Sequence, residues 1–125
     1  MEDNTEQRRS KRVRVHVPVR YRALKAGAGV TGSSTLSRNL SESGVRFKAA
    51  EFISIATRLI LEMDIPLLNK PVKAISKIAW IRKVSAGEDY DVGSYFLEMS
   101  KKDKELISEY VDEVEAEDSS DRAAA

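Results

Sequence analysis

The chain has 125 residues, a formal net charge of +1 and 42% hydrophobic residues, which is the size and composition of one soluble domain. It has no cysteine and one histidine, His16, which excludes disulfides and thiolate metal sites and leaves little support for a Ser-His-Asp triad. No acid–base pair, nucleophile or metal-ligand set stands out, so we expect no catalysis, no cofactor and no metal. The polar, acidic N-terminus does not read as a signal peptide, and we expect a cytoplasmic protein.

Alternating apolar residues separated by turns predict a series of antiparallel strands. In chain order, the predicted strands cover residues 12–22, 35–40, 45–47, 58–65, 72–84 and 90–99. Pro18 falls inside the first strand and predicts an edge position or a bulge, because proline cannot donate a ladder hydrogen bond. Trp80, Tyr95 and Phe96 are expected to pack in the core. Because no helix separates the strands, the pattern favours an antiparallel barrel or sandwich over a parallel α/β fold.

One helix is predicted after the last strand. Ser100 followed by Asp103 is similar to a capping box. One face of the helix then carries the apolar residues Leu106, Ile107, Tyr110, Val111 and Val114. We expect this face to pack across the barrel, although it would also suit a dimer seam. Residues 119–125 are expected to fray into a tail.

The charges are segregated along the chain. Between Gln7 and Ser41 there are nine basic residues and no acidic one, whereas residues 103–121 are strongly acidic. Charge asymmetry of this kind informs about partners more than about fold. The basic N-terminal part therefore predicts an anionic ligand or partner.

A pair of arginines near the N-terminus is the first functional motif. In Arg8-Arg9-Ser10-Lys11-Arg12, the outer arginines stand four residues apart, which keeps them on one side of either a helix or a strand. Two guanidinium groups so placed suit a planar, multiply charged anion. Arginine donates paired hydrogen bonds to phosphate or to the edge of guanine, and its guanidinium stacks on aromatic rings.

The second motif is Asn39-Leu40-Ser41-Glu42-Ser43-Gly44. On extended backbone Asn39 and Ser41 point the same way and offer short polar groups for phosphate, ribose or base. Gly44 permits a positive φ or a close backbone approach at a tight turn. Together with the arginine pair, this motif predicts a nucleotide held without a metal.

Three weaker patterns have ordinary explanations. Gly27 to Gly32 spells Gly-x-Gly-x-x-Gly, but no helix follows it, so we interpret it as a flexible hairpin loop rather than a dinucleotide site. His16 is expected on the surface. The acidic residues Glu88, Asp89 and Asp91 lack calcium-loop spacing and are attributed to a turn.

The two functional motifs, in this order and followed by Gly44-Val45-Arg46-Phe47, resemble the PilZ domain family of bacteria. Ile78-Ala79-Trp80-Ile81 and the segment 90–96 are similar to the later strands of that family, so the resemblance covers about residues 8–112. It implies a mainly β fold, a six-stranded antiparallel barrel with one C-terminal α-helix. We expect a disordered arm over residues 1–7, the domain over 8–115 and an acidic, alanine-containing tail over 116–125.

The resemblance also implies a receptor for the second messenger cyclic di-GMP, without catalytic activity. The arm arginines would contact guanine and phosphate and wrap around the ligand, and the second motif would contact the opposite guanine and its phosphate edge. The residues implied are Arg8, Arg9, Arg12, Asn39, Ser41, Ser43 and Gly44. Ordering of the arm would then pass the signal to a downstream protein that the sequence does not identify.

Two other functions remain open. The chain could be a PilZ-fold adaptor that acts through protein contacts and binds ligand weakly or not at all. It could also be a nucleic-acid-binding barrel that uses the basic N-terminal half, with affinity that falls steeply with salt. Substitution of Asn39 would weaken ligand binding by a receptor but leave nucleic-acid binding unchanged.

Overall fold

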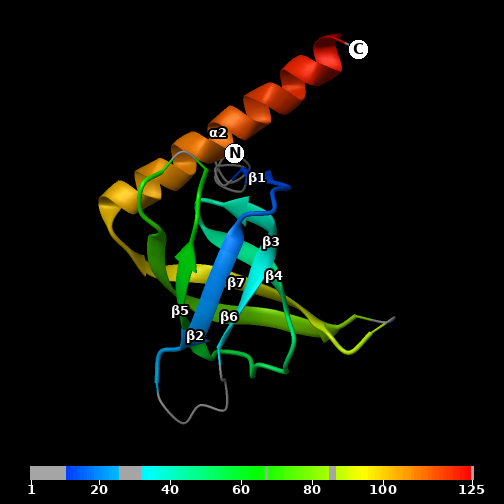
Figure 1. The fold of residues 1–125 in the computed structure, drawn as a ribbon, viewed down its shortest axis with the longest axis vertical. Coiled ribbons are helices and arrows are strands. Elements are labelled where there is room, and N and C mark those ends of the chain that lie inside the picture. Colours follow the sequence, from blue (N-terminus) through cyan, green and yellow to red (C-terminus); the bar gives the residue numbers. More distant parts are fainter. Residues whose placement is uncertain (1–10, 26–31, 67, 85–86, 125) are drawn as a thin grey trace, which may run out of the picture.

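The computed structural model describes residues 11–25, 32–66, 68–84 and 87–124, with helix side chains up to Glu117. Its strands and helix are labelled in Figure 1. In chain order they are β1 (Arg12–Val13), β2 (Pro18–Ala23), β3 (Ser33–Ser41), β4 (Gly44–Ala49), β5 (Arg58–Met63), β6 (Val72–Lys83), β7 (Tyr90–Met99) and α2 (Lys101–Ala124).

Strands β2 to β7 form a closed antiparallel barrel of six strands. The order is β3-β2-β5-β6-β7-β4, and pairing of β3 with β4 closes it. Alternate side chains point inward, so that Val19, Phe47 and Leu61 are completely buried. The rings of Tyr21 and Phe47 pack in this core with their centroids 5.3 Å apart. The predicted barrel with one C-terminal helix is confirmed.

The strand predicted over residues 12–22 is interrupted between β1 and β2. Ser37 of β3 occupies the break: its Oγ accepts a hydrogen bond from Val17 N at 2.9 Å and donates one to Val15 O. Pro18 begins β2, a position where proline is tolerated. Because β2 pairs with both β3 and β5, the predicted edge position is wrong. The irregularity expected at Pro18 takes the form of this break.

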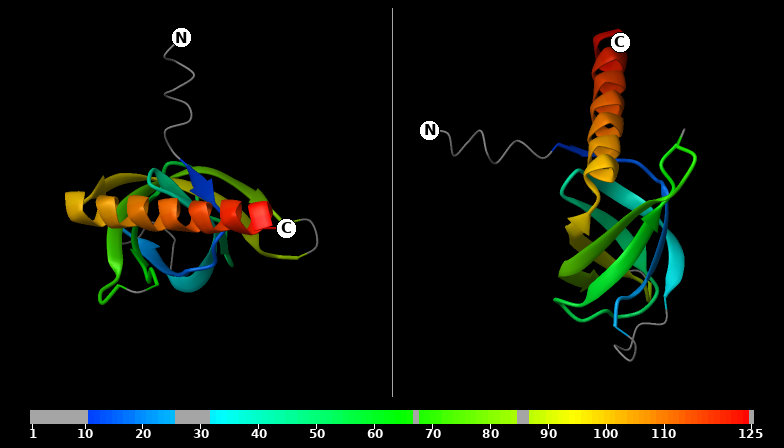
Figure 2. Two further views of the ribbon diagram at one scale, coloured as in Figure 1. Left: turned by 90° about the horizontal axis from the view of Figure 1, so that it is seen from above. Right: turned by 90° about the vertical axis from the view of Figure 1, so that its left-hand side faces the viewer.

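Helix α2 lies across one end of the barrel, with its C-terminal end rising away from the strands (Figure 2). The Ser100 hydroxyl accepts a hydrogen bond from Asp103 N at 3.0 Å, which confirms the predicted cap. Ile107 and Val111 are buried and close the barrel end. The helix continues to Ala124 where a tail was expected from residue 119, and neither glycine nor proline interrupts this segment.

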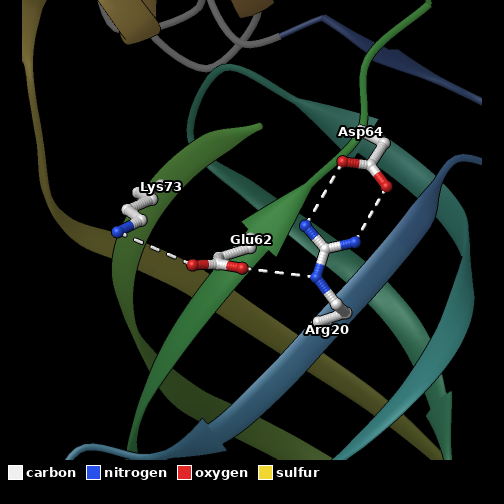
Figure 3. Close-up of polar contacts among 4 residues, drawn as sticks. All are labelled: Arg20, Glu62, Asp64 and Lys73. Carbon is white, nitrogen blue, oxygen red and sulfur yellow. Dashed lines mark hydrogen bonds and ion pairs between the residues drawn. The ribbon is translucent and has the colours of Figure 1, made fainter. Parts of the chain in front are cut away.

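On the outer surface, a charged network joins β2 to β5 and β6 (Figure 3). The Arg20 guanidinium donates to Glu62 Oε1 at 3.2 Å and to Asp64 Oδ2 at 2.8 Å, and Lys73 Nζ lies 3.6 Å from Glu62 Oε2. The hydrogen bond from Arg20 lowers the pKa of Asp64. These side chains are 29–67% exposed, so we expect salt to screen the network. No helix in the described ranges has the length and apolarity needed to cross a membrane.

Candidate functional site

A hollow of about 240 Å³ opens on the outer face of the barrel and is called here the β4 hollow. Residues from β1, β3, β4, β6 and β7 contribute to it. Its lining comprises Arg12, Asn39, Leu40, Ser41, Ser43, Gly44, Val45, Arg46, Ala79, Trp80, Gly93, Ser94 and Tyr95. The lining is mixed: a few buried apolar residues lie beneath polar groups, two arginines and two aromatic side chains.

The structure brings the two sequence motifs together in the β4 hollow. Five of the seven predicted residues line it, namely Arg12, Asn39, Ser41, Ser43 and Gly44. Arg12 reaches the hollow because β1 pairs with the end of β3, where Arg12 stands opposite Ser41. The remaining two, Arg8 and Arg9, lie outside the described residues.

Ser41 organises the turn between β3 and β4. Its side chain is buried, and its Oγ accepts hydrogen bonds from Ser43 N at 3.2 Å and from Gly44 N at 3.1 Å. The Ser43 hydroxyl lies 3.0 Å from the same Oγ. Both serines therefore shape the rim of the hollow through this turn.

Gly44 is needed for close packing of β4 against β7. Its φ is not positive, so the left-handed conformation considered from the sequence is not used. A Cβ built on Gly44 would overlap the carbonyl oxygen of Ser94 and lie 3.1 Å from the Cα of Tyr95. The close-approach explanation of this glycine is the one that the structure supports.

Trp80 is the main site feature that the sequence did not predict. The indole is 39% exposed and lines the β4 hollow, and Tyr95 is 41% exposed beside it. The prediction that these two residues pack in the core is wrong. Between Ile78 and Trp80 the β6–β7 register shifts by a bulge, and one extra residue turns the next side chain to the opposite face. Phe96 does pack against the core.

Two guanidinium groups hold the indole in place. The Cζ of Arg46 lies 5.6 Å from the centroid of the Trp80 ring, and the Cζ of Arg82 lies 5.7 Å from it. Both arginines also bind the Asp91 carboxylate: Arg46 Nε donates to Oδ1 at 3.0 Å, and Arg82 Nη2 donates to Oδ2 at 3.4 Å. Trp80 thus lines the same hollow as Arg12 and Asn39, with its ring in two cation–π contacts.

The Asp91 carboxylate that binds both arginines is itself held in the charged form. The hydrogen bond from Arg46 lowers the pKa of Asp91, whose side chain is only 10% exposed. Asp91 is therefore a paired carboxylate, and it lies in strand β7 and not in the turn to which the sequence assigned it. Among the described residues no group of three metal-ligating side chains comes together. Arginine, amide and indole groups in one hollow suit a planar aromatic anion.

The other sequence patterns stay outside the β4 hollow. His16 is exposed, as predicted, and its Nδ1 donates to Ser37 O at 2.8 Å. The glycine-rich segment connects the antiparallel strands β2 and β3, but residues 26–31 lie outside the described residues. Gly32, at its end, has a φ of +88°.

A family model for the PilZ domain matches residues 6–113 of the chain. The search of curated proteins found none that matches this chain. The match covers both motifs, every described strand and the first part of α2.

Several solved structures share the fold. The inhibitor of motility MotI/DgrA of Bacillus subtilis has 16% identity and a TM-score of 0.74, with 89% of this chain and 52% of that chain covered. The PilZ domain of Escherichia coli YcgR, solved with c-di-GMP, has 15% identity and a TM-score of 0.67, with 95% and 99% covered.

The MrkH–c-di-GMP complex of K. pneumonia has 13% identity and a TM-score of 0.66, with 90% of this chain and 53% of that chain covered. The chain thus spans about half the length of the MotI and MrkH chains and nearly all of the YcgR domain. At these identities the likeness concerns the fold.

Proposed function

The chain belongs to the PilZ domain family, and from that premise we propose that it is a receptor for cyclic di-GMP that acts through binding and not through catalysis. The observation that carries the proposal is the meeting of Arg12 and Asn39 beside the exposed indole of Trp80 in one hollow. Two of its structural neighbours, the YcgR domain and MrkH, were solved with this ligand.

Each group in the hollow matches a part of the ligand. Arg12 offers a charged fork to a phosphate or to the O6/N7 edge of guanine. Asn39 offers an amide that can pair with the edge of the opposite guanine. The indole of Trp80 offers a stacking surface, and base–aromatic stacking contributes about 1–3 kcal/mol. Ser41 and Gly44 keep the turn in the shape that presents Asn39.

The arm completes the site in this proposal. Arg8 and Arg9 precede Arg12 in the chain and would close over the ligand from the β1 side. Ordering of the arm on binding would change the surface next to α2, because Lys11 already pairs with Asp112 at 3.3 Å and Glu115 at 3.2 Å. A downstream protein would read that change.

Isothermal titration with cyclic di-GMP tests the proposal. Arg12→Ala removes a charge-assisted contact worth about 1.5–3 kcal/mol, so we expect the affinity to fall roughly 10- to 150-fold. Asn39→Ala and Trp80→Ala should weaken binding of the same ligand. Arg14→Ala is the matched control, because Arg14 is also an exposed arginine but does not line the hollow.

Two results would refute the proposal. Absence of saturable binding by the folded wild-type chain would favour the adaptor function. Equal losses for Arg12→Ala and Arg14→Ala, with no effect of Asn39→Ala, would indicate a diffuse basic surface such as nucleic-acid binding requires. The stoichiometry from the same titration distinguishes one bound ligand molecule from a pair.

A further inference from the structure

A second hollow lies on the outer face of the barrel beside the first. It has a volume of about 420 Å³ and is called here the β3 hollow. It is lined by His16, Thr35, Leu36, Arg38 and Lys48. None of these residues lines the β4 hollow, and none is used by the proposed ligand site.

The charges in the β3 hollow are all basic. Its lining contains no carboxylate. In the described part of the chain, neither Arg38 nor Lys48 has an ion-pair partner, although Arg20, Arg46 and Arg82 each pair with an acid nearby. His16 donates through Nδ1 to Ser37 O, so the positive charge of the hollow comes from Arg38 and Lys48. The hollow therefore presents positive charge that no described carboxylate neutralises.

A bulge in β3 gives the hollow its composition. The β3–β4 register shifts between Ser37 and Asn39, so Arg38 is the extra residue. Asn39 then lines the β4 hollow and Arg38 lines the β3 hollow. Bulges re-aim side chains in this way and are over-represented next to functional sites.

The hollow also holds an apolar side chain in an unusual position. Leu36 is 52% exposed although it lies in the middle of a nine-residue strand. Leu36 is the one large apolar side chain in the lining of this hollow, and it gives the basic residues around it an aliphatic contact point. Single-stranded nucleic-acid sites combine basic residues with aromatic side chains on which bases stack, and the lining of the β3 hollow has no tryptophan, tyrosine or phenylalanine. These features favour a protein partner.

We propose that the β3 hollow is a docking surface for an acidic segment of a partner protein that carries an aliphatic side chain. The aliphatic side chain packs on Leu36, and flanking carboxylates pair with Arg38 and Lys48. Charge complementarity identifies the partner's chemistry, and the volume suits a few side chains of an extended segment. The docking surface does not depend on the proposed ligand, because the two hollows share no residue.

NMR titration of the ¹⁵N-labelled chain tests this surface with a defined probe. The probe is the acetylated peptide Asp-Glu-Leu-Asp-Glu-Leu-Asp-Glu, and its control has serine in place of each leucine. We expect saturable shifts of the amides of Leu36, Arg38 and Lys48 with the leucine peptide and at least fivefold weaker binding of the serine peptide. Lys48→Glu should weaken peptide binding at least tenfold.

Lys70→Glu is the matched control, because Lys70 is an exposed lysine outside both hollows and its substitution makes the same charge change. It should bind the peptide like the wild type. Titration of Lys48→Glu with cyclic di-GMP separates this proposal from the receptor proposal, since loss of peptide binding with unchanged ligand binding supports docking at a distinct surface.

Three outcomes would overturn the proposal. One is the absence of shifts in the β3 hollow at millimolar peptide. Another is equal peptide binding by Lys48→Glu and the wild type. The third is tighter binding of a random 20-base-pair duplex than of the leucine peptide at the same residues, which would assign the surface to nucleic acid.

Discussion

The indole of Trp80 lies directly over the backbone of Gly93 in the neighbouring strand. A Cβ built on Gly93 would overlap Nε1 and Cε2 of the indole. The two residues are register partners in the β6–β7 pair. The glycine thus provides the space in which the aromatic surface of the site rests, and the two arginines hold the indole there.

Gly93→Ala should displace Trp80 and weaken the site. Overpacking of this kind costs about 1–3 kcal/mol of stability, and we expect affinity for cyclic di-GMP to fall with loss of the stacking surface. Urea denaturation and calorimetric titration measure the two effects. Gly87→Ala is the control, because a Cβ there would meet its nearest neighbour only at 4.0 Å. Wild-type affinity of a Gly93→Ala variant would contradict the role given to Trp80.

Gly44→Ala should destabilise the chain more than Gly93→Ala does. The added Cβ would meet the backbone oxygen of Ser94, and backbone in a paired strand cannot rotate away as a side chain can. We expect a lower urea midpoint with a loss of at least about 1–3 kcal/mol. A midpoint equal to that of the wild type would show that β4 and β7 separate at this end without cost.

The Arg46–Asp91 pair should make stability depend on pH. Arg46 holds the pKa of Asp91 in the folded chain below its ordinary value of 3.8. Between these two pKa values the unfolded chain therefore binds more protons than the folded chain. The pair therefore stabilises the fold above the ordinary pKa, and this stabilisation is lost as pH falls through the folded pKa. Asp91→Asn should cost about 1–3 kcal/mol at pH 7, and the difference from wild type should vanish in acid.

The Arg20–Asp64 pair in Figure 3 provides the comparison for this experiment. Its pKa shift has the same direction, but the Arg20 and Asp64 side chains are 41% and 44% exposed. We expect any stability difference of Asp64→Asn to disappear in 1 M salt, where the screening length is about 3 Å. The Asp91→Asn difference should persist in that salt, and its loss would show that Asp91 behaves as a surface carboxylate.

The pairs between Lys11 and α2 should hold β1 in place. Asp112→Asn combined with Glu115→Gln removes both partners, so the amides of β1 should exchange hydrogen faster while those of β5 do not change. High salt should have the same effect on the wild-type chain, because these side chains are 45–58% exposed. Glu113→Gln is the control, since Glu113 is exposed and has no ion pair among the described residues. Unchanged exchange in the double variant would mean that backbone pairing alone fixes β1.

The barrel could be predicted from sequence because apolar and polar residues alternate along its strands. The helix could be predicted because its apolar residues fall on one face. Residues such as Val19, Phe47 and Ile107 fall where those periods place them, and all three are buried. The two motifs also identified most of the described polar lining of the β4 hollow, because β1 pairs with the end of β3 and brings the motifs together.

Trp80 could not be predicted as a site residue, for a physical reason. A bulge adds one residue to a strand and reverses the faces beyond it, and alternation alone does not reveal where it falls. The available signal was Gly93, since a glycine inside a strand marks a bulge or a close approach. The sequence indicated an irregularity at Pro18 but not a break over residues 14–17, because the break depends on Ser37 from another strand.

The two bulges have a consequence for engineering the protein. Asn39 and Trp80 each follow directly after a register shift, and each presents its side chain to the β4 hollow while its strand still supplies the core with Ser37, Leu40 and Ile78. The side chains at these two positions can therefore be changed without a change in the residues that pack inside the barrel. We therefore expect a library randomised at Asn39 and Trp80 to retain folded members, which would let side chains of the hollow be varied without redesign of the barrel.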